Sequence, residues 1–128
     1  MPISVDYDPD RGFLICSVRG EFELDAFQSF LEELTSSTTI AHGINTLWDL
    51  RQMDFSSVDA DHIQRILAIR RRFRARDATA RVALVVSQDL GFRMSRTYEA
   101  LAVIMPTRIC VFRRYEEAEQ WLLEGEDG

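Results

Sequence analysis

Apolar and polar residues alternate along the start of the chain in a pattern typical of β-structure. The runs 3–7 and 13–19 are rich in β-forming residues, and the segment between them contains Pro9 and Gly12, which favour a turn. This pattern predicts an opening β-hairpin. In the next segment, 24–34, apolar residues recur at the i, i+3, i+4 and i+7 positions, which predicts an amphipathic helix.

The rest of the chain alternates between strand-like and helix-like patterns. We expect strands at 44–50, 81–86 and 107–112, and helices at 58–76, around 94–105 and at 115–123. Helical crossovers connect parallel strands, whereas a hairpin connects antiparallel ones. The predicted fold is therefore α/β, with a mixed five-stranded sheet, an opening antiparallel hairpin and helical crossovers.

Length and composition fit one soluble domain. The chain has 128 residues, of which 46% are hydrophobic and 28% are charged. We expect a single domain over 1–123 and a disordered acidic tail over 124–128. No apolar run approaches the roughly 20 residues that span a bilayer, and the start lacks the pattern of a secretory signal, so we expect a cytoplasmic protein.

Charge and motif content argue against several functions. The net charge of −6 disfavours general binding to nucleic acids. Cys16 and Cys110 lie in apolar runs, as buried cysteines in a reducing compartment do, and His42 and His62 lack the spacing of metal ligands. The sequence contains no glycine-rich phosphate loop, nucleophile elbow or zinc-protease motif. We therefore expect no enzyme activity, no cofactor and no metal.

Candidate binding residues follow the predicted parallel strands. Ligands of open α/β sheets gather at the carboxyl ends of the strands, where helix N-termini also point. Four arginines there would suit an anion, whereas three nearby acids oppose one. The arginines are Arg51, Arg96, Arg113 and Arg114, and the acids are Asp54, Asp59 and Asp61. Our candidates for binding a ligand or partner are Asp49, Arg51, Asp54, Asp59, Ser87 and Arg96.

The junction between the third strand and the second helix has two interpretations. Ser56 followed by Asp59 approximates a capping box, and Ser57 followed by Asp59 and Asp61 is an alternative cap. In the functional interpretation, Ser57 or Ser56 is an exposed phosphoacceptor whose modification switches a partner surface. Further along this helix, the arginine-rich run 70–76 is expected to be a solvated, acid-paired helix end.

Several segments resemble STAS domains, and more closely their SpoIIAA-like (STAS/SEC14-like) branch of small, mostly uncharacterised bacterial proteins. The resemblance rests on Asp49-Leu50 and Phe55 before the serines, on 81–86 continuing to 91–99, and on 111–122. In the anti-sigma factor antagonists of the STAS group, a serine at the corresponding helix start accepts phosphate from a partner kinase. Here Ser56 and Ser57 come slightly earlier, without the flanking Asp and Gly of that pattern. The resemblance implies the fold predicted above.

Three functions follow as hypotheses. The first is a non-enzymatic regulatory module that binds a protein partner or a second copy of itself. The second is a small carrier or sensor of an apolar or anionic, lipid-like ligand, because the third helix has more apolar side chains than one face buries and would line a pocket or a dimer seam. An enzyme would require residues among Asp49, Arg51, Ser57, Ser87 and Arg96 to meet in a cleft. The apolar side chains of the third helix are Met94, Tyr98, Leu101, Val103, Ile104 and Met105.

Overall fold

The computed structural model describes residues 3–37, 44–73, 80–104 and 107–124. Strands and helices follow one another in the predicted order, with a short 3-10 helix, η1, after α3. The expected acidic tail lies beyond the described residues, apart from Glu124, which ends α4. The elements are β1 (Ile3–Asp8), β2 (Phe13–Glu21), α1 (Leu24–Ser36), β3 (Asn45–Asp54), α2 (Ala60–Arg72), β4 (Arg81–Val85), α3 (Asp89–Leu101), η1 (Ala102–Ile104), β5 (Arg108–Phe112) and α4 (Tyr115–Glu124).

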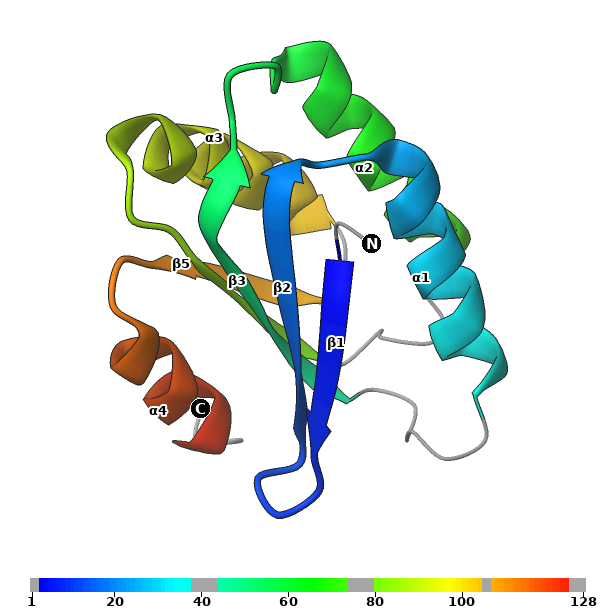
Figure 1. Cartoon of the computed structure of the whole chain (residues 1–128), viewed down its shortest axis with the longest axis vertical. Coiled ribbons are helices and arrows are strands. Elements are labelled where there is room, and N and C mark those ends of the chain that lie inside the picture. Colours follow the sequence, from blue (N-terminus) through cyan, green and yellow to red (C-terminus); the bar gives the residue numbers. More distant parts are fainter. Residues whose placement is uncertain (1–2, 38–43, 74–79, 105–106, 125–128) are drawn as a thin grey trace.

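The five strands form one mixed sheet in the order β1-β2-β3-β4-β5 (Figure 1). β1 and β2 are antiparallel, and every later neighbouring pair is parallel. Each parallel strand is joined to the next by a helix, because a chain that continues in the same direction must cross back over the sheet. The predicted fold class, with its hairpin and crossovers, is confirmed.

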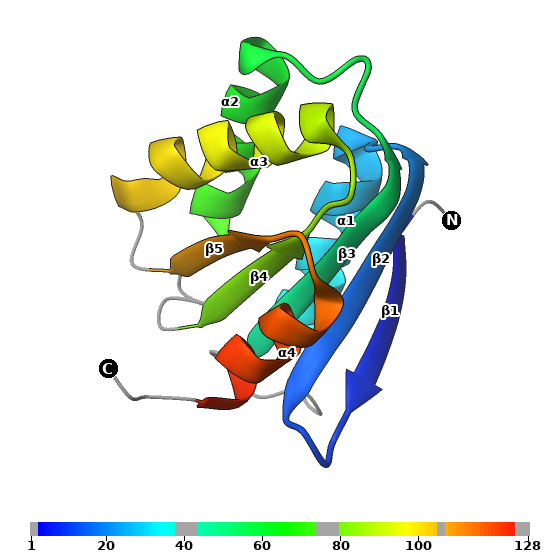
Figure 2. The ribbon, with the colours of Figure 1, turned by 90° about the vertical axis from the view of Figure 1, so that its left-hand side faces the viewer.

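Helices cover both faces of the sheet, but unequally. α1, α2 and α3 lie on one face and α4 lies alone on the other (Figure 2). The main core, between the sheet and the three helices, contains Trp48, Leu67 and Leu84, whereas the smaller core under α4 contains Phe13, Leu47 and Leu122. In the described part of the chain, no helix is both long and apolar enough to cross a membrane.

β3 extends four residues beyond its predicted end at Leu50. Its last residues pair with the end of β2, where Gly20 lies opposite Met53. The register shifts beside Val18, so that β3 has one residue more than β2 at this point, which is a β-bulge. Because a bulge changes which face the following side chains occupy, Met53 is buried on the same face as Leu50, although the two residues are three positions apart.

The two cysteines differ in their surroundings. Cys16 is fully buried in the main core, where burial raises the pKa of its thiol. Cys110 lies on the edge strand β5 and is half-buried, and burial raises the pKa of its thiol as well. Neither thiol is therefore activated as a nucleophile, since the reactive form is the thiolate.

Candidate functional site

Three of the predicted site residues meet where the middle of β3 passes the carboxyl end of β4. The Arg51 guanidinium donates two hydrogen bonds of 2.8 Å to the two carboxylate oxygens of Asp49, and it lies 5.0 Å from the ring centre of Tyr115. The Ser87 hydroxyl donates to the backbone carbonyl of Arg51 at 3.3 Å. This cluster lies on the α4 side, because Asp49 is opposite Ser17 and Val85 in the sheet, and Val85 belongs to the core under α4.

Three of the four arginines predicted to bind an anion are already paired with carboxylates. The hydrogen bonds from Arg51 lower the pKa of Asp49, and those to Asp49 raise the pKa of Arg51. Arg96, another predicted site residue, pairs with Glu99 at 3.0 Å, and Arg113 pairs with Asp89 at 3.0 Å. Since each of these guanidinium groups already contacts a carboxylate, their net attraction for an added anion is small.

A second group of predicted residues forms the turn between β3 and α2. The Asp54 carboxylate accepts a hydrogen bond of 2.9 Å from the backbone N–H of Ser56, and hydrogen bonds from Ser56 lower the pKa of Asp54. The backbone N–H of Val58 donates to the carbonyl of Phe55 at 3.0 Å. Ser56 and Ser57 are exposed, whereas Phe55 between Asp54 and the serines is buried. A buried ring thus anchors a turn that presents both serines to solvent.

The predicted serine caps are wrong. The N-cap of α2 is Asp59, whose carboxylate accepts a hydrogen bond of 2.9 Å from the backbone N–H of His62. The hydrogen bond between Val58 and Phe55 places Ser56 and Ser57 in the turn before the helix, so neither serine occupies the cap position. Their hydroxyls are therefore not needed to begin the helix.

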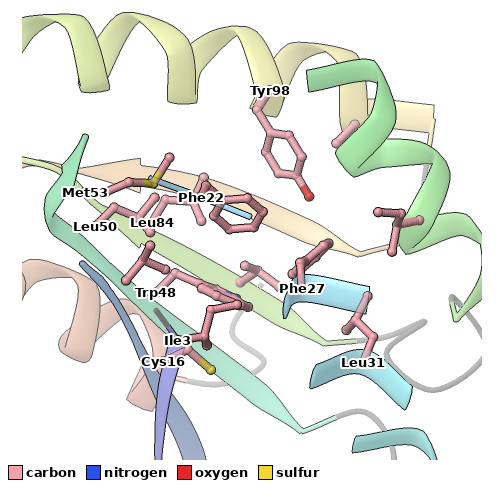
Figure 3. Packing of buried hydrophobic residues seen from close by; sticks show 14 of the residues in the cluster. Ile3, Cys16, Phe22, Phe27, Leu31, Trp48, Leu50, Met53, Leu84 and Tyr98 are labelled. Carbon is pink, nitrogen blue, oxygen red and sulfur yellow. The ribbon is translucent and has the colours of Figure 1, made fainter. Parts of the chain in front are cut away.

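An apolar pocket lies between α2, α3 and the sheet, and we call it the α2–α3 pocket. Its cavity volume is about 70 Å³. Figure 3 shows Tyr98 extending from α3 toward α2, above the layer of Trp48, Leu50 and Leu84 from the sheet. The described residues that line the pocket are Phe22, Phe27, Trp48, Leu50, Met53, Phe55, Val58, Ile63, Ile66, Arg70, Val82, Leu84, Met94, Ser95 and Tyr98.

The third helix contributes to this pocket as the second hypothesis expects, but only over part of its length. Met94 and Tyr98 line the pocket. Leu101 and Val103 do not, and they are exposed to 37% and 77%. Met105 and the side chain of Ile104 lie outside the described residues. The apolar side chains of this segment are therefore divided between the pocket and an exposed patch at the end of α3.

Arg70 is buried, which corrects the expectation of a solvated helix end. Only 5% of its surface is exposed, and it lines the α2–α3 pocket. Residue 70 follows Ile63 by seven positions and Leu67 by three, so it falls on the apolar face of α2. The spacing to Ile63 and Leu67 could have predicted from the sequence that Arg70 is buried. The neighbouring arginines instead suggested a solvated helix end. Arg71 and Arg72 are exposed, as expected, and residues 74–76 lie outside the described part.

Gly91 allows α3 to approach the turn closely. A Cβ atom at this position would lie 2.8 Å from the Phe55 ring, which is closer than side-chain atoms normally come. Gly91 is in the first turn of α3, and Phe55 precedes the exposed serines. No sequence pattern predicts this contact, because it joins the first turn of α3 to the residue that follows β3, which is distant along the chain.

The predicted site residues therefore form separate groups. Asp49, Arg51 and Ser87 lie together, but they line neither the α2–α3 pocket nor the smaller pocket beside Phe30 and Leu34. Asp54, Asp59 and the two serines form the turn, and Arg96 stands apart on α3. Among the described residues, no three His, Cys, Asp or Glu side chains are arranged to hold a metal ion.

Comparisons with known proteins find a matching family model and a similar solved structure. A family model described as SpoIIAA-like matches residues 13–123. The chain also resembles the crystal structure of an uncharacterized protein of the DUF3478 family from Shewanella loihica, which has a SpoIIAA-like fold. The TM-score is 0.64 and the sequences are 17% identical, over 94% of this chain and 91% of that one. At this identity the likeness shows the fold alone. No curated protein matches the sequence.

Proposed function

The chain belongs to the SpoIIAA-like family, and from this premise we propose that it is a non-enzymatic regulatory module that presents the turn between β3 and α2 to a protein partner. The observation that carries the proposal is the turn itself. Two exposed serines stand on a backbone that is fixed by hydrogen bonds from Ser56 to Asp54 and from Val58 to Phe55. A fixed, exposed segment loses little conformational entropy when it binds.

The charge of the turn indicates the kind of partner. Asp54, Asp59 and Asp61 are all exposed around the two serines. Opposite charges across an interface accelerate association and select the partner. We therefore propose a partner with a basic surface, which is either another protein or a second copy of this chain.

Phosphorylation of Ser57 or Ser56 would regulate this surface. Both residues lie two or three positions before Asp59, the N-cap of α2, and the helix dipole favours negative charge at this end of the helix. A phosphate would also add charge beside Asp54 and Asp59, and like charges repel. The modification would therefore strengthen the charge pattern that the partner contacts and change the conformation of the turn.

Site-specific crosslinking tests the partner-binding function. A photoreactive amino acid replaces Ser57, the protein is expressed in cells of its source organism, and the crosslinked products are identified by mass spectrometry. A matched probe at Gln120, exposed on α4, is the control. We expect one dominant crosslinked product from the probe at position 57. Asp54→Arg should reduce the yield of this product, and the probe at position 120 should not form it. Equal, unspecific products from both positions would disprove the proposal, and the same spectra report phosphate on Ser56.

A second candidate function, a sensor or carrier of a small apolar or anionic ligand, is favoured by the α2–α3 pocket. Its lining is mostly apolar, and it contains the buried Arg70. Small-molecule sites commonly combine apolar walls with a few polar groups that orient the ligand. The two functions are compatible, because the pocket and the turn share Phe55 and Val58.

A further inference from the structure

We propose that two copies of this chain form a symmetric dimer in which their β5 strands pair antiparallel, edge to edge, with the two Cys110 residues opposite each other. The paired edge is separate from the turn between β3 and α2, because β4 lies between β3 and β5 in the sheet. The dimer therefore goes beyond the proposed function and does not rest on it.

β5 lies at one edge of the sheet, and among the described strands only β4 pairs with it. Toward β4, the N–H of Arg108 and the carbonyl of Phe112 form hydrogen bonds of 3.1 and 3.0 Å. Successive residues of a strand direct their backbone groups to opposite sides, so Ile109 and Val111 direct theirs outward. There the Val111 N–H contacts the Cys110 sulfur, a weak acceptor that a carbonyl of another strand would replace. The outer edge is therefore a template for a further strand.

The other edge strand, β1, is protected against such pairing, whereas β5 is not. β1 carries Asp6 and Asp8, and charged side chains on an edge strand keep copies of a sheet apart. The four residues of β5 after Arg108 are uncharged and half-buried, with α3 on one face and α4 on the other (Figure 2). Of the two edges of the described sheet, β5 is therefore the one that accepts a partner strand.

The symmetric register with the longest overlap centres on Cys110, the middle residue of the five in β5. In this register, Ile109 of each copy exchanges both of its backbone hydrogen bonds with Val111 of the other. Cys110 then lies opposite itself in a pair without backbone hydrogen bonds, where Cα atoms are about 4.5 Å apart. Arg108 lies opposite the Phe112 ring of the second copy, so no like charges face each other along the two strands.

The side of α3 and η1 beside this edge carries a stripe of four residues. They recur at intervals of four, three and four positions, which places them on one side of the helix. Cys110 lies close enough to two of them, Arg96 and Glu99, for both charges to act on the pKa of its thiol. Near the start of the helix, the Arg113 guanidinium, which follows β5, lies 4.3 Å from the ring centre of Phe92. The residues of this α3 stripe are Phe92, Arg96, Glu99 and Val103.

The α3 stripe is complementary to itself in the dimer. Its charged residues lie at its centre, and its apolar residues lie at its two ends. Because the two-fold axis reverses the stripe of the second copy, Arg96 faces Glu99 of that copy. Phe92 in the same way faces Val103, which is 77% exposed in the single chain and would then be covered. Opposite charges across an interface select the partner, so this arrangement selects a second copy of the chain.

A charge exchange tests the pairing of the stripes. Arg96→Glu gives each copy acids alone at the centre of the stripe, and Glu99→Arg gives each copy arginines alone. In sedimentation equilibrium of the reduced full chain, we expect the wild type to dimerise and each variant alone to dimerise at least about tenfold more weakly. An equimolar mixture of the two variants should restore the dimer, because each acid then faces an arginine. Arg93→Glu, at an exposed position of α3 outside the stripe, is the matched control and should leave dimerisation unchanged.

Disulfide formation tests the register. Diamide takes up the hydrogen atoms of the two Cys110 thiols and leaves a disulfide between the copies. We expect a covalent dimer from the wild type and none from Cys110→Ser, since Cys16 is fully buried. Arg108→Cys in the Cys110→Ser background places a thiol at a more exposed position of the same strand. The antiparallel register holds the two residues 108 about 14 Å apart along the strands, so this variant should crosslink at least about tenfold more slowly.

Each contrary result has a defined meaning. A wild-type chain that stays monomeric at every concentration would overturn the dimer. Dimerisation that neither charge variant weakens, or that their mixture does not restore, would overturn the α3 stripe as its interface. Crosslinking through position 108 as fast as through Cys110 would overturn the register. The photoreactive probe at Ser57 reports on the turn alone, so the partner-binding function and the dimer can each fail without the other.

Discussion

The carboxylate of Asp59 accepts a hydrogen bond from the backbone N–H of His62, one of the first N–H groups of α2 that lack a partner inside the helix. Asp59→Ala removes this acceptor, and we expect the free energy of unfolding to fall by about 1 kcal/mol in urea denaturation. Ser57→Ala is the matched control and should change it by less than about 0.5 kcal/mol. A larger effect at Ser57 than at Asp59 would contradict the assignment of the cap.

Asp49 and Arg51 form an ion pair with two hydrogen bonds, and its contribution should depend on pH. The hydrogen bonds from Arg51 hold the pKa of Asp49 below its ordinary value of 3.8 in the folded protein. The resulting stabilisation is complete at neutral pH, because Asp49 is ionised in both states there. It declines as the pH falls below about 4, where the unfolded chain takes up the proton first.

Asp49→Asn measures this contribution. We expect the variant to lose about 1 kcal/mol of unfolding free energy at pH 7. The difference from the wild type should shrink as the pH is lowered through 3.8. Asp61→Asn, which breaks the highly exposed pair with Arg65, is the control and should have almost no effect. A difference for Asp49→Asn that stays constant down to the acid transition would exclude the ion pair as its cause.

Individual residues show how far the sequence predicts local roles. The Ser-Ser-x-Asp pattern identified the start of α2 but not the capping residue. Serine and aspartate can both cap a helix, and the backbone geometry decides which residue of this stretch does so. The burial of Arg70 could be read from its spacing to Ile63 and Leu67. Its neighbours suggested a solvated cluster, but on a helix the apolar face, and not the local composition, determines which arginine turns inward.

Among the elements, β3 has the largest effect on the candidate site. Its bulge and its extension along β2 bring Met53 and Phe55 onto the face that α1, α2 and α3 cover. The existence and order of the strands followed from apolar periodicity, which is a property of each segment alone. The bulge did not, because it depends on how β3 pairs with Gly20 and its neighbours, which are distant along the chain.

The contact between Gly91 and Phe55 couples α3 to this end of β3. Gly91→Ala would place a methyl group 2.8 Å from the ring. Forcing the ring aside costs about 1–3 kcal/mol, and the higher helix propensity of alanine offsets about 1 kcal/mol of that cost. We therefore expect a net loss of about 1 kcal/mol in unfolding free energy.

A double-mutant cycle separates the two effects. In a Phe55→Leu background the ring edge is absent, so Gly91→Ala should become neutral or stabilising by up to about 1 kcal/mol. Urea denaturation of the four proteins gives the coupling energy directly. If Gly91→Ala has the same effect in both backgrounds, the contact with Phe55 does not determine the choice of glycine.

At the scale of the whole molecule, the two faces of the sheet are stabilised unequally. Among the described residues, 21 are buried in the main core and six in the core under α4. α4 adds Ala118 and Leu122 to the buried residues of its core, with Trp121 partly buried beside them. A helix with so few buried contacts is expected to unfold locally before the sheet does.

The two tryptophans report on these two faces, since Trp48 lies in the main core and Trp121 packs against the core under α4. Incorporation of fluorotryptophan gives one fluorine NMR signal for each, and Trp121→Phe assigns them. In Leu122→Ala, we expect the Trp121 signal to change at a lower urea concentration than the Trp48 signal, because the lost packing destabilises α4. Leu123→Ala, at an exposed position, is the control. If both signals changed together in Leu122→Ala, α4 would be part of one cooperative unit with the sheet, and the cluster of Asp49, Arg51 and Tyr115 beneath it would be as stable as the pocket on the other face.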